Sequence, residues 1–99
     1  MQTEKLIPLH TFCTHHQIEF SFIDELQQFG LIEITTVEES AFIDTDQVTQ
    51  LEQYIRLNRE LNINLEGIDV VTHLLQKLRE TKQEIIALKN RLRLYENPD

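Results

Sequence analysis

The side chains most capable of chemistry lie close together near the start of the sequence. Residues 10–16 contain His10, Cys13, His15 and His16, and Cys13 is the single cysteine of the 99-residue chain. Helical residues three apart drift by about 60° around the axis, so this group could supply two metal ligands and less easily three. A structural zinc ion needs about four. We therefore expect no metal site here, and a buried Cys13 that behaves as a small apolar group.

No other pattern in the sequence indicates an enzyme. A Cys–His enzyme also needs donors for a developing oxyanion and a substrate pocket, and neither is indicated. The sequence contains no glycine-rich phosphate loop and no nucleophile elbow. Basic residues do not separate the phenylalanines as they do on nucleobase-stacking surfaces. We expect no enzymatic activity, no cofactor, and core positions for Phe20, Phe22, Phe29 and Phe42.

Charge is distributed unevenly along the chain. The formal net charge is −8, and residues 1–50 carry nine acids and one base, Lys5, whereas residues 51–99 carry eight of each. Such a first half repels a phosphate backbone and attracts a basic protein. The sequence therefore favours recognition of a protein over recognition of nucleic acid.

The expected location is the cytoplasm. A single cysteine excludes an internal disulfide and fits a reducing compartment. The first ten residues have no apolar run of signal-peptide length, and no stretch approaches the roughly 18 apolar residues of a membrane span. We expect no membrane association.

Two short helices are expected to position these residues. Pro8 predicts the start of the first, over about 8–16. The second is predicted over about 19–29 from apolar side chains at 3–4 spacing, and Gly30 is typical of a helix C-terminus. The expected inward residues are Leu9, Phe12 and Cys13, with His16 at the border of the core, then Phe22, Ile23, Leu26 and Phe29.

The middle of the chain predicts a hairpin and a third helix. Residues 31–43 change to a two-residue period, which predicts a small β-hairpin with a loose turn near 38–40. Asp44 is then expected to cap a third helix, and Gln47 completes a capping-box pattern. The expected apolar side of this helix consists of Val48, Leu51, Ile55 and Leu61.

The last helix is predicted over about 65–95, with Asn64 as its N-cap and Gly67 permitting close packing. Apolar residues alternate at spacings of three and four over more than three heptads, which predicts a coiled-coil seam. A small globule cannot cover a helix of about 45 Å, so the seam needs a partner, most simply a second copy of the chain. The alternative is a helix folded back on its own domain. The expected dimerisation residues are Val71, Leu74, Leu78, Ile85, Leu88 and Leu92, with Thr81 as a polar break.

The order of these parts resembles that of MerR-type winged helix-turn-helix proteins. The register of their first two helices matches "LHTFCTHHQIEFSFIDELQQFGLI", and their segment after the wing matches "FIDTDQVTQLEQYIRLNRELNINLEGI". The resemblance implies a mainly α fold with a small β-hairpin wing and a long C-terminal coiled-coil helix. It divides the chain into a winged helix-turn-helix-like domain, 1–62, and a dimerising helix, 63–99.

A narrower resemblance covers about residues 6–95. It is carried by "FC-x-H", "RLNRELNINLEGIDVV" and "LLQKLRETKQEIIALKNRL", which resemble the CbpM family of chaperone modulatory proteins. That family implies binding to, and inhibition of, the J-domain of a CbpA-like co-chaperone, a relative of DnaJ. J-domains carry a basic stretch on their second helix that docks on a DnaK-type chaperone, and an acidic surface could block it. The expected contact residues are Glu19, Asp24, Glu25 and Gln28 of the second helix, and Glu38 and Glu39 of the wing.

Two alternatives to this interpretation remain. The acids could be solvated carboxylates that only keep the protein soluble. The protein could also be a MerR-like DNA-binding transcriptional regulator, but such regulators place arginines near the start of the second helix to hold phosphates. This chain has Ser21 and Asp24 there, and no Lys or Arg between Lys5 and Arg56. Because each phosphate contact depends on a cation, DNA binding is disfavoured.

Overall fold

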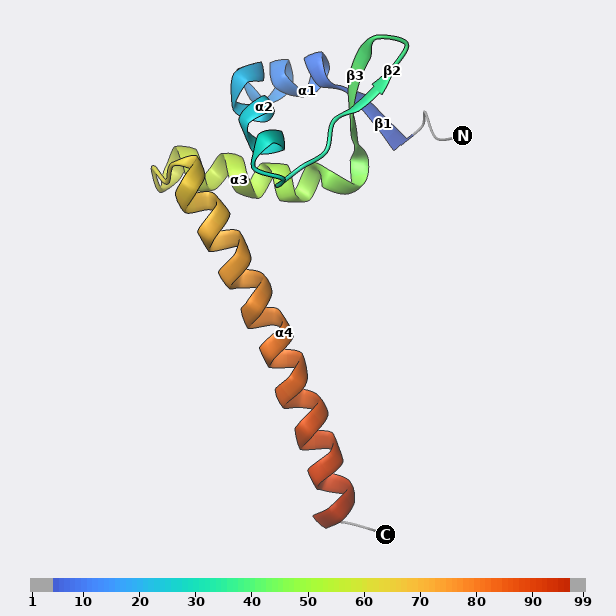
Figure 1. Ribbon diagram of the computed structural model, residues 1–99, viewed down its shortest axis with the longest axis vertical. Coiled ribbons are helices and arrows are strands. Elements are labelled where there is room, and N and C mark those ends of the chain that lie inside the picture. Colours follow the sequence, from blue (N-terminus) through green and yellow to red (C-terminus); the bar gives the residue numbers. More distant parts are fainter. Residues whose placement is uncertain (1–4, 97–99) are drawn as a thin grey trace. The chain divides into compact units, whose positions relative to one another are not determined.

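The computed structural model describes residues 5–96. The chain forms two compact units, Met1–Asp69 and Val70–Asp99. Short helices and a small sheet make up the first unit, and the second unit is the larger part of the final helix (Figure 1). The predicted mainly helical architecture, with a small wing and a long C-terminal helix, is confirmed.

The helix-turn-helix consists of α1 (Leu9–His16) and α2 (Phe20–Gln28). Between them, Gln17 has a left-handed φ of 56°, and the first two N–H groups after α1 bond back to carbonyls of its last turn. A left-handed conformation costs a residue other than glycine roughly 1–2 kcal/mol. The guanidinium group of Arg59 donates a hydrogen bond to the Gln17 carbonyl oxygen and so helps to hold the turn.

The C-terminus of α2 is built around Gly30, as predicted. Gly30 has a φ of 78°. Its N–H donates to the carbonyl of Gln27 at 2.9 Å, and the N–H of Leu31 donates to the carbonyl of Leu26 at 3.0 Å. These two bonds define a Schellman motif, which requires a left-handed residue at the position of Gly30.

Within the described residues, three short antiparallel strands form a sheet in the order β1-β3-β2 (Figure 1). The predicted hairpin is present as β2 (Thr35–Val37) and β3 (Ser40–Asp44). The sequence did not predict β1 (Leu6–Pro8), which pairs Ile7 with Ile43 on the other side of β3. Three residues, the last of them a proline, are too few to show an alternating pattern, so this strand depends on its tertiary partner.

The turn of the hairpin is tight rather than loose as predicted. Glu38 and Glu39 have φ values of 50° and 68°, and the flanking residues Val37 and Ser40 pair directly. Two positive φ values are typical of a two-residue turn, which favours Asn-Gly. The two glutamates are therefore held at the tip of the wing against a local conformational cost.

Helix α3 (Val48–Glu60) follows a short 3-10 turn, η2 (Thr45–Gln47). Asp44 was predicted to cap the third helix but caps η2 instead, where its carboxylate accepts a hydrogen bond from the backbone N–H two residues on, at 2.8 Å. The N-cap position of α3 is Gln47, which makes no side-chain cap bond. The predicted capping-box role of Gln47 is wrong. Its side-chain amide instead bonds to both the N–H and the carbonyl of Glu33, each at 2.8 Å, and ties the segment after α2 to the start of α3.

The core of the first unit is apolar. Its largest fully buried side chain is Tyr54, whose hydroxyl donates to the Leu31 carbonyl at 3.3 Å. Two residues expected to point inward, Phe29 and Leu61, are instead 38% and 64% exposed, because each lies at a helix C-cap where the helical period ends. Within residues 5–96, the buried apolar residues are Leu9, Phe12, Ile23, Leu26, Ile32, Ile43, Leu51, Tyr54, Ile55 and Ile68.

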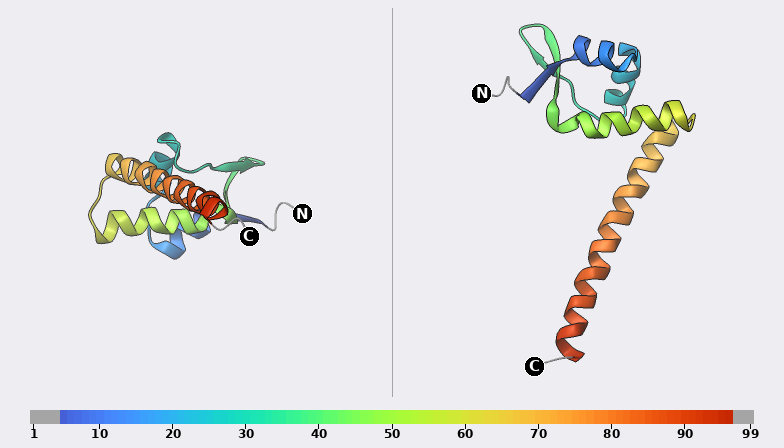
Figure 2. Two further views of the ribbon diagram at one scale, coloured as in Figure 1. Left: turned by 90° about the horizontal axis from the view of Figure 1, so that it is seen from below. Right: turned by 180° about the vertical axis from the view of Figure 1, so that it is seen from behind.

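The long helix α4 (Leu65–Glu96) begins at the predicted N-cap, since the Asn64 Oδ1 atom accepts from the Gly67 N–H at 2.8 Å. A Cβ atom on Gly67 would lie 2.6 Å from Cγ2 of Ile63. The glycine therefore permits a close approach, but to the preceding segment rather than to another helix. From there α4 continues without interruption (Figure 2).

Candidate protein-binding surface

The predicted contact residues of the second helix lie on and beside α2. Glu19 is its N-cap residue, and Gln28 at its end donates to Asp24 Oδ2 at 2.9 Å. The Ser21 hydroxyl donates to Glu19 Oε1 at 3.4 Å. Within residues 5–96, none of the carboxylates of Glu19, Asp24 and Glu25 has an ion-pair partner. Their negative charge is therefore not neutralised within this part of the chain.

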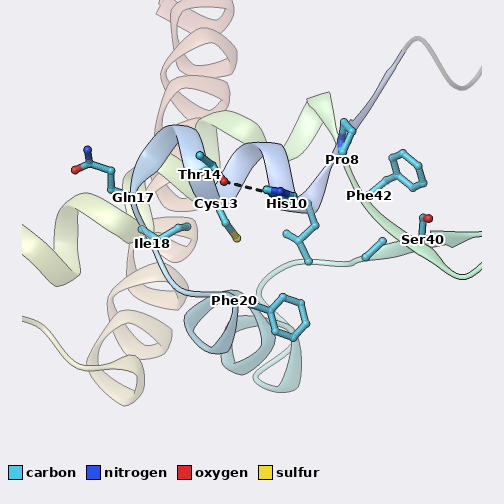
Figure 3. A pocket seen from close by; sticks show the side chains of 11 residues that line it. Pro8, His10, Cys13, Thr14, Gln17, Ile18, Phe20, Ser40 and Phe42 are labelled. Carbon is cyan, nitrogen blue, oxygen red and sulfur yellow. Dashed lines mark hydrogen bonds between the residues drawn. The ribbon is translucent and has the colours of Figure 1, made fainter.

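The predicted wing residues, Glu38 and Glu39, lie at the exposed tip of the β2–β3 hairpin. They too have no ion-pair partner among the described residues. A groove lies between Phe20, at the start of α2, and strand β3 of the wing (Figure 3). The predicted residues, five acids and Gln28, therefore fall in two groups, one in the α2 region and one at the wing tip, and none of them lines the groove. Glu19 and Glu25 instead line a second pocket together with Arg59.

This groove has a volume of about 890 Å³. Figure 3 shows His10 and Cys13 on the α1 side, Phe20 across from them, and Phe42 beyond, on β3. Apolar side chains make up most of its lining, and its polar members are His10, Thr14, Gln17 and Ser40. An apolar centre with a polar rim is the usual anatomy of a protein interface.

Phe20 was expected in the core, and that prediction is wrong. The side chain is 55% exposed and forms a wall of the groove. As the first residue of α2, it lies beside the groove, whereas Ile23 and Leu26 further along the helix are fully buried. Phe22 packs against the core as predicted, while Phe42 is half-buried and lines the groove. The groove leaves no signal in the sequence, because an apolar residue at a helix start can equally belong to a core or to a groove wall.

His10 and His16 have different hydrogen-bond partners. His16 borders the core, as expected, with its ring stacked on Phe12 at a centroid distance of 4.1 Å and its Nε2 atom 3.3 Å from a carboxylate oxygen of Glu52. His10 Nδ1 lies 3.3 Å from the Thr14 hydroxyl. Within residues 5–96, no group of three or more His, Cys, Asp and Glu side chains is placed to hold a metal ion.

Cys13 is half-buried rather than buried, and its sulfur atom points from α1 into the groove (Figure 3). Desolvation by this burial raises the pKa of the thiol. Burial without a neighbouring cation keeps a thiol protonated and unreactive. Cys13 is therefore suited to line an apolar surface and not to act as a nucleophile.

Comparison with known proteins places this arrangement in a family. The chain belongs to the MerR HTH family of regulatory proteins, which it matches over residues 7–90. It is similar to proteins named chaperone modulatory protein CbpM. One, from Pseudomonas entomophila (strain L48), is 28% identical over 88 residues, which are 87% of this chain and 86% of that protein. Another, from Escherichia coli O1:K1 / APEC, is 28% identical over 82 residues, 82% of this chain and 81% of that protein.

Both resemblances that the sequence predicts are thereby confirmed. The names of the relatives describe regulators and modulators rather than enzymes. No solved structure matches the chain. In the part of the chain described, no helix combines the length and the apolar character needed to cross a membrane.

Proposed function

We propose that this protein is a non-enzymatic chaperone modulator that binds the J-domain of a CbpA-like co-chaperone and inhibits it. The observation that carries the proposal is the charge of the first unit, since residues 1–69 hold thirteen acids and three bases. The name of the relatives, chaperone modulatory protein, supports a link to chaperones. A J-domain with a basic second helix complements the acidic surface, and its capture would keep that helix from a DnaK-type chaperone.

The wing supports a functional role for at least some of these acids. Glu38 and Glu39 both adopt the left-handed conformation, in a turn where asparagine and glycine are favoured. Residues held in an unfavourable backbone conformation, with no contact that compensates for it, are concentrated at functional sites. The surface that we assign to the J-domain consists of Glu19, Asp24, Glu25 and Gln28 of the α2 region, and Glu38 and Glu39 of the wing.

Charge reversal on α2 tests this surface. Asp24→Lys combined with Glu25→Lys is expected to raise the Kd for the J-domain more than about tenfold, because each substitution places a cation against the basic helix. The matched control is Glu33→Lys with Glu60→Lys, which changes the net charge equally at exposed positions outside the surface. An unchanged Kd in the α2 variant would remove this surface from the proposal. Equal weakening in both variants would reduce its role to long-range attraction.

We also infer that the helix-turn-helix does not bind DNA as a regulator would. The start of α2 presents Ser21 and Asp24, and no base lies between Lys5 and Arg56. Phosphate contacts depend on cations, so a duplex would meet repulsion at this surface. An electrophoretic mobility shift experiment with random-sequence duplexes and with the promoter of the protein's own gene should show no complex at physiological salt. A shift that depends on α2 residues would support the DNA-binding alternative.

We further propose that the chain is a homodimer through α4. Along the predicted seam, the leucines and isoleucine beyond Val71 are 47% to 63% exposed in the single chain. Uncovered apolar stripes of this extent mark interaction surfaces, and heptad spacing fits a second helix of the same kind. The proposed dimerisation residues are Val71, Leu74, Leu78, Ile85, Leu88 and Leu92.

Sedimentation velocity tests the dimer directly. The wild-type chain should sediment as a dimer at micromolar concentration. Leu78→Asp should shift it to a monomer, because a carboxylate in a coiled-coil layer must be desolvated. Arg79→Asp, one position away on the exposed side of the same helix, should leave the dimer intact. A monomeric wild-type chain, or a dimeric Leu78→Asp variant, would contradict the proposal.

A further inference from the structure

The groove between α1, Phe20 and the wing is mainly apolar, so attraction between charges does not explain it. We propose that it receives the apolar face of a lysine- and arginine-rich amphipathic helix of the partner protein. This inference deepens the proposed function and rests on it, since it adds an apolar centre to a surface so far defined by its acids.

The size of the groove fits a helix face better than a single side chain. Its volume of about 890 Å³ lies near the upper end of the roughly 300–1,000 Å³ typical of binding pockets. An amphipathic helix in a groove inserts several apolar side chains, at positions i, i+3 or i+4, and i+7. Leu9, Cys13, Phe20 and Phe42 line the groove, and Phe20 exposes more than half of its surface there. Exposed aromatic residues at a groove wall are typical of interface hot spots.

Charge selects which amphipathic helix fits. Glu19 directly precedes Phe20 on one wall, and Glu38 and Glu39 directly precede Ser40 on the other. Among residues 5–96, no Lys or Arg lines the groove; Arg59, which bonds to the carbonyl of the lining residue Gln17, is a cation beside it, but the first unit as a whole carries thirteen acids against three bases. A helix whose apolar face is flanked by Lys and Arg is attracted by this net negative charge, whereas an acidic or uncharged helix is not.

A synthetic peptide tests the groove independently of the J-domain. The probe carries leucine at i, i+3, i+4 and i+7 and lysine on its flanks, and the control peptide has serine in place of leucine at equal charge. We expect the leucine peptide to bind the full chain at least about tenfold more tightly than the serine peptide. We also expect it to slow alkylation of Cys13 by a neutral thiol reagent. Equal binding of both peptides, or unprotected Cys13, would overturn the proposal.

Matched variants locate the contact. Phe20→Ala should weaken binding of the leucine peptide about tenfold or more. Phe29→Ala, which removes an exposed phenylalanine near the other end of α2 and outside the groove, should change it by less than about twofold. Ser40→Trp should also weaken binding, by filling the groove from the wing. Thermal melts of the three variants establish that each is folded, and equal effects of Phe20→Ala and Phe29→Ala would contradict the assignment.

The same variants, titrated with a J-domain, separate this inference from the proposed function. If the J-domain binds but Phe20→Ala leaves its Kd unchanged and the alkylation rate of Cys13 does not fall on binding, the function stands and the groove proposal falls. If the J-domain does not bind but the leucine peptide does, and protects Cys13, the groove proposal stands and the function falls. Protection of Cys13 that rises with the concentration of this chain alone would assign the groove to a second copy and overturn the proposal.

Discussion

At the scale of single residues, the wing tip and the groove depart from what stability alone would select. Glu38 and Glu39 occupy a turn that asparagine and glycine would form at lower cost. Phe20 leaves more than half of an aromatic side chain in water. Neither feature contributes to the core, and Phe20 belongs to the same helix as the acids of α2. These two departures are why we assign binding to these residues.

Cys13 provides a prediction that depends on pH. Burial raises the pKa of its thiol, so less of the reactive thiolate exists near neutral pH than in an unfolded chain. Alkylation of the folded protein should be severalfold slower than that of the urea-unfolded protein. Its rate should keep rising with pH beyond about 8.5, where a free cysteine is half ionised. The thiol's contribution to stability is complete below the unfolded pKa and decreases as the pH rises through the folded pKa.

The pH–rate profiles of alkylation by a neutral reagent, measured in the folded and unfolded protein, test this prediction. Superimposable profiles would show that Cys13 is not desolvated and would contradict its placement in the groove.

Gly67 and Ile63 form a second pair whose effect can be measured. Gly67→Ala places a Cβ atom 2.6 Å from Cγ2 of Ile63. Overpacking costs about 1–3 kcal/mol, while alanine gains about 1 kcal/mol over glycine in a helix, so we expect a net loss of about 1 kcal/mol. In an Ile63→Ala background, which lacks this methyl group, the same substitution should instead stabilise the protein. Urea denaturation of the four variants checks the sign change, and additive effects would contradict the contact.

At the scale of elements, the sequence predicted what local signals determine. Gly30 after an apolar 3–4 pattern and Asn64 before one marked helix ends that are confirmed by their hydrogen bonds. Elements that depend on distant partners were missed or misassigned. The strand β1 exists because Ile7 pairs with Ile43, and Gln47 bonds to Glu33 rather than completing a local cap. Such pairings between distant residues leave no periodic pattern in either segment.

The candidate site divides in the same way. The acids were identifiable from the sequence, because acidic residues and a stretch without Lys or Arg can be read from it directly. The groove was not, because its lining comes from four separate elements, β1, α1, α2 and β3. Residues such as Leu9 and Ala41 line it from segments about thirty residues apart.

The seam of α4 makes a prediction at the scale of an element. Thr81 is the polar residue in a run of apolar positions that extends from Val71 to Leu92. If the seam is a dimer interface, Thr81→Leu should strengthen the dimer, because it replaces two hydroxyl groups in one layer with apolar side chains. The concentration dependence of Tm measures this, with the dimer of the variant persisting at lower concentration. An unchanged or weakened dimer would contradict the proposed register.

At the scale of the whole molecule, the two units differ in net charge. Residues 1–69 carry thirteen acids and three bases, whereas residues 70–99 carry four acids and six bases. The first unit is therefore complementary in charge to a basic partner. The second unit has a small net charge, so a contact between two copies of it would depend on its apolar residues. A modulator needs both properties if it presents two identical acidic surfaces from one dimer.

The most direct test is a calorimetric titration of the full chain with the J-domain of a CbpA-like protein from the same genome, at low and at physiological salt. We predict binding at micromolar Kd or tighter, weakened by salt because exposed charges contribute to it. Binding that persists in part at physiological salt would fit the additional apolar contact in the groove. The absence of binding at both salt concentrations would contradict the proposed function.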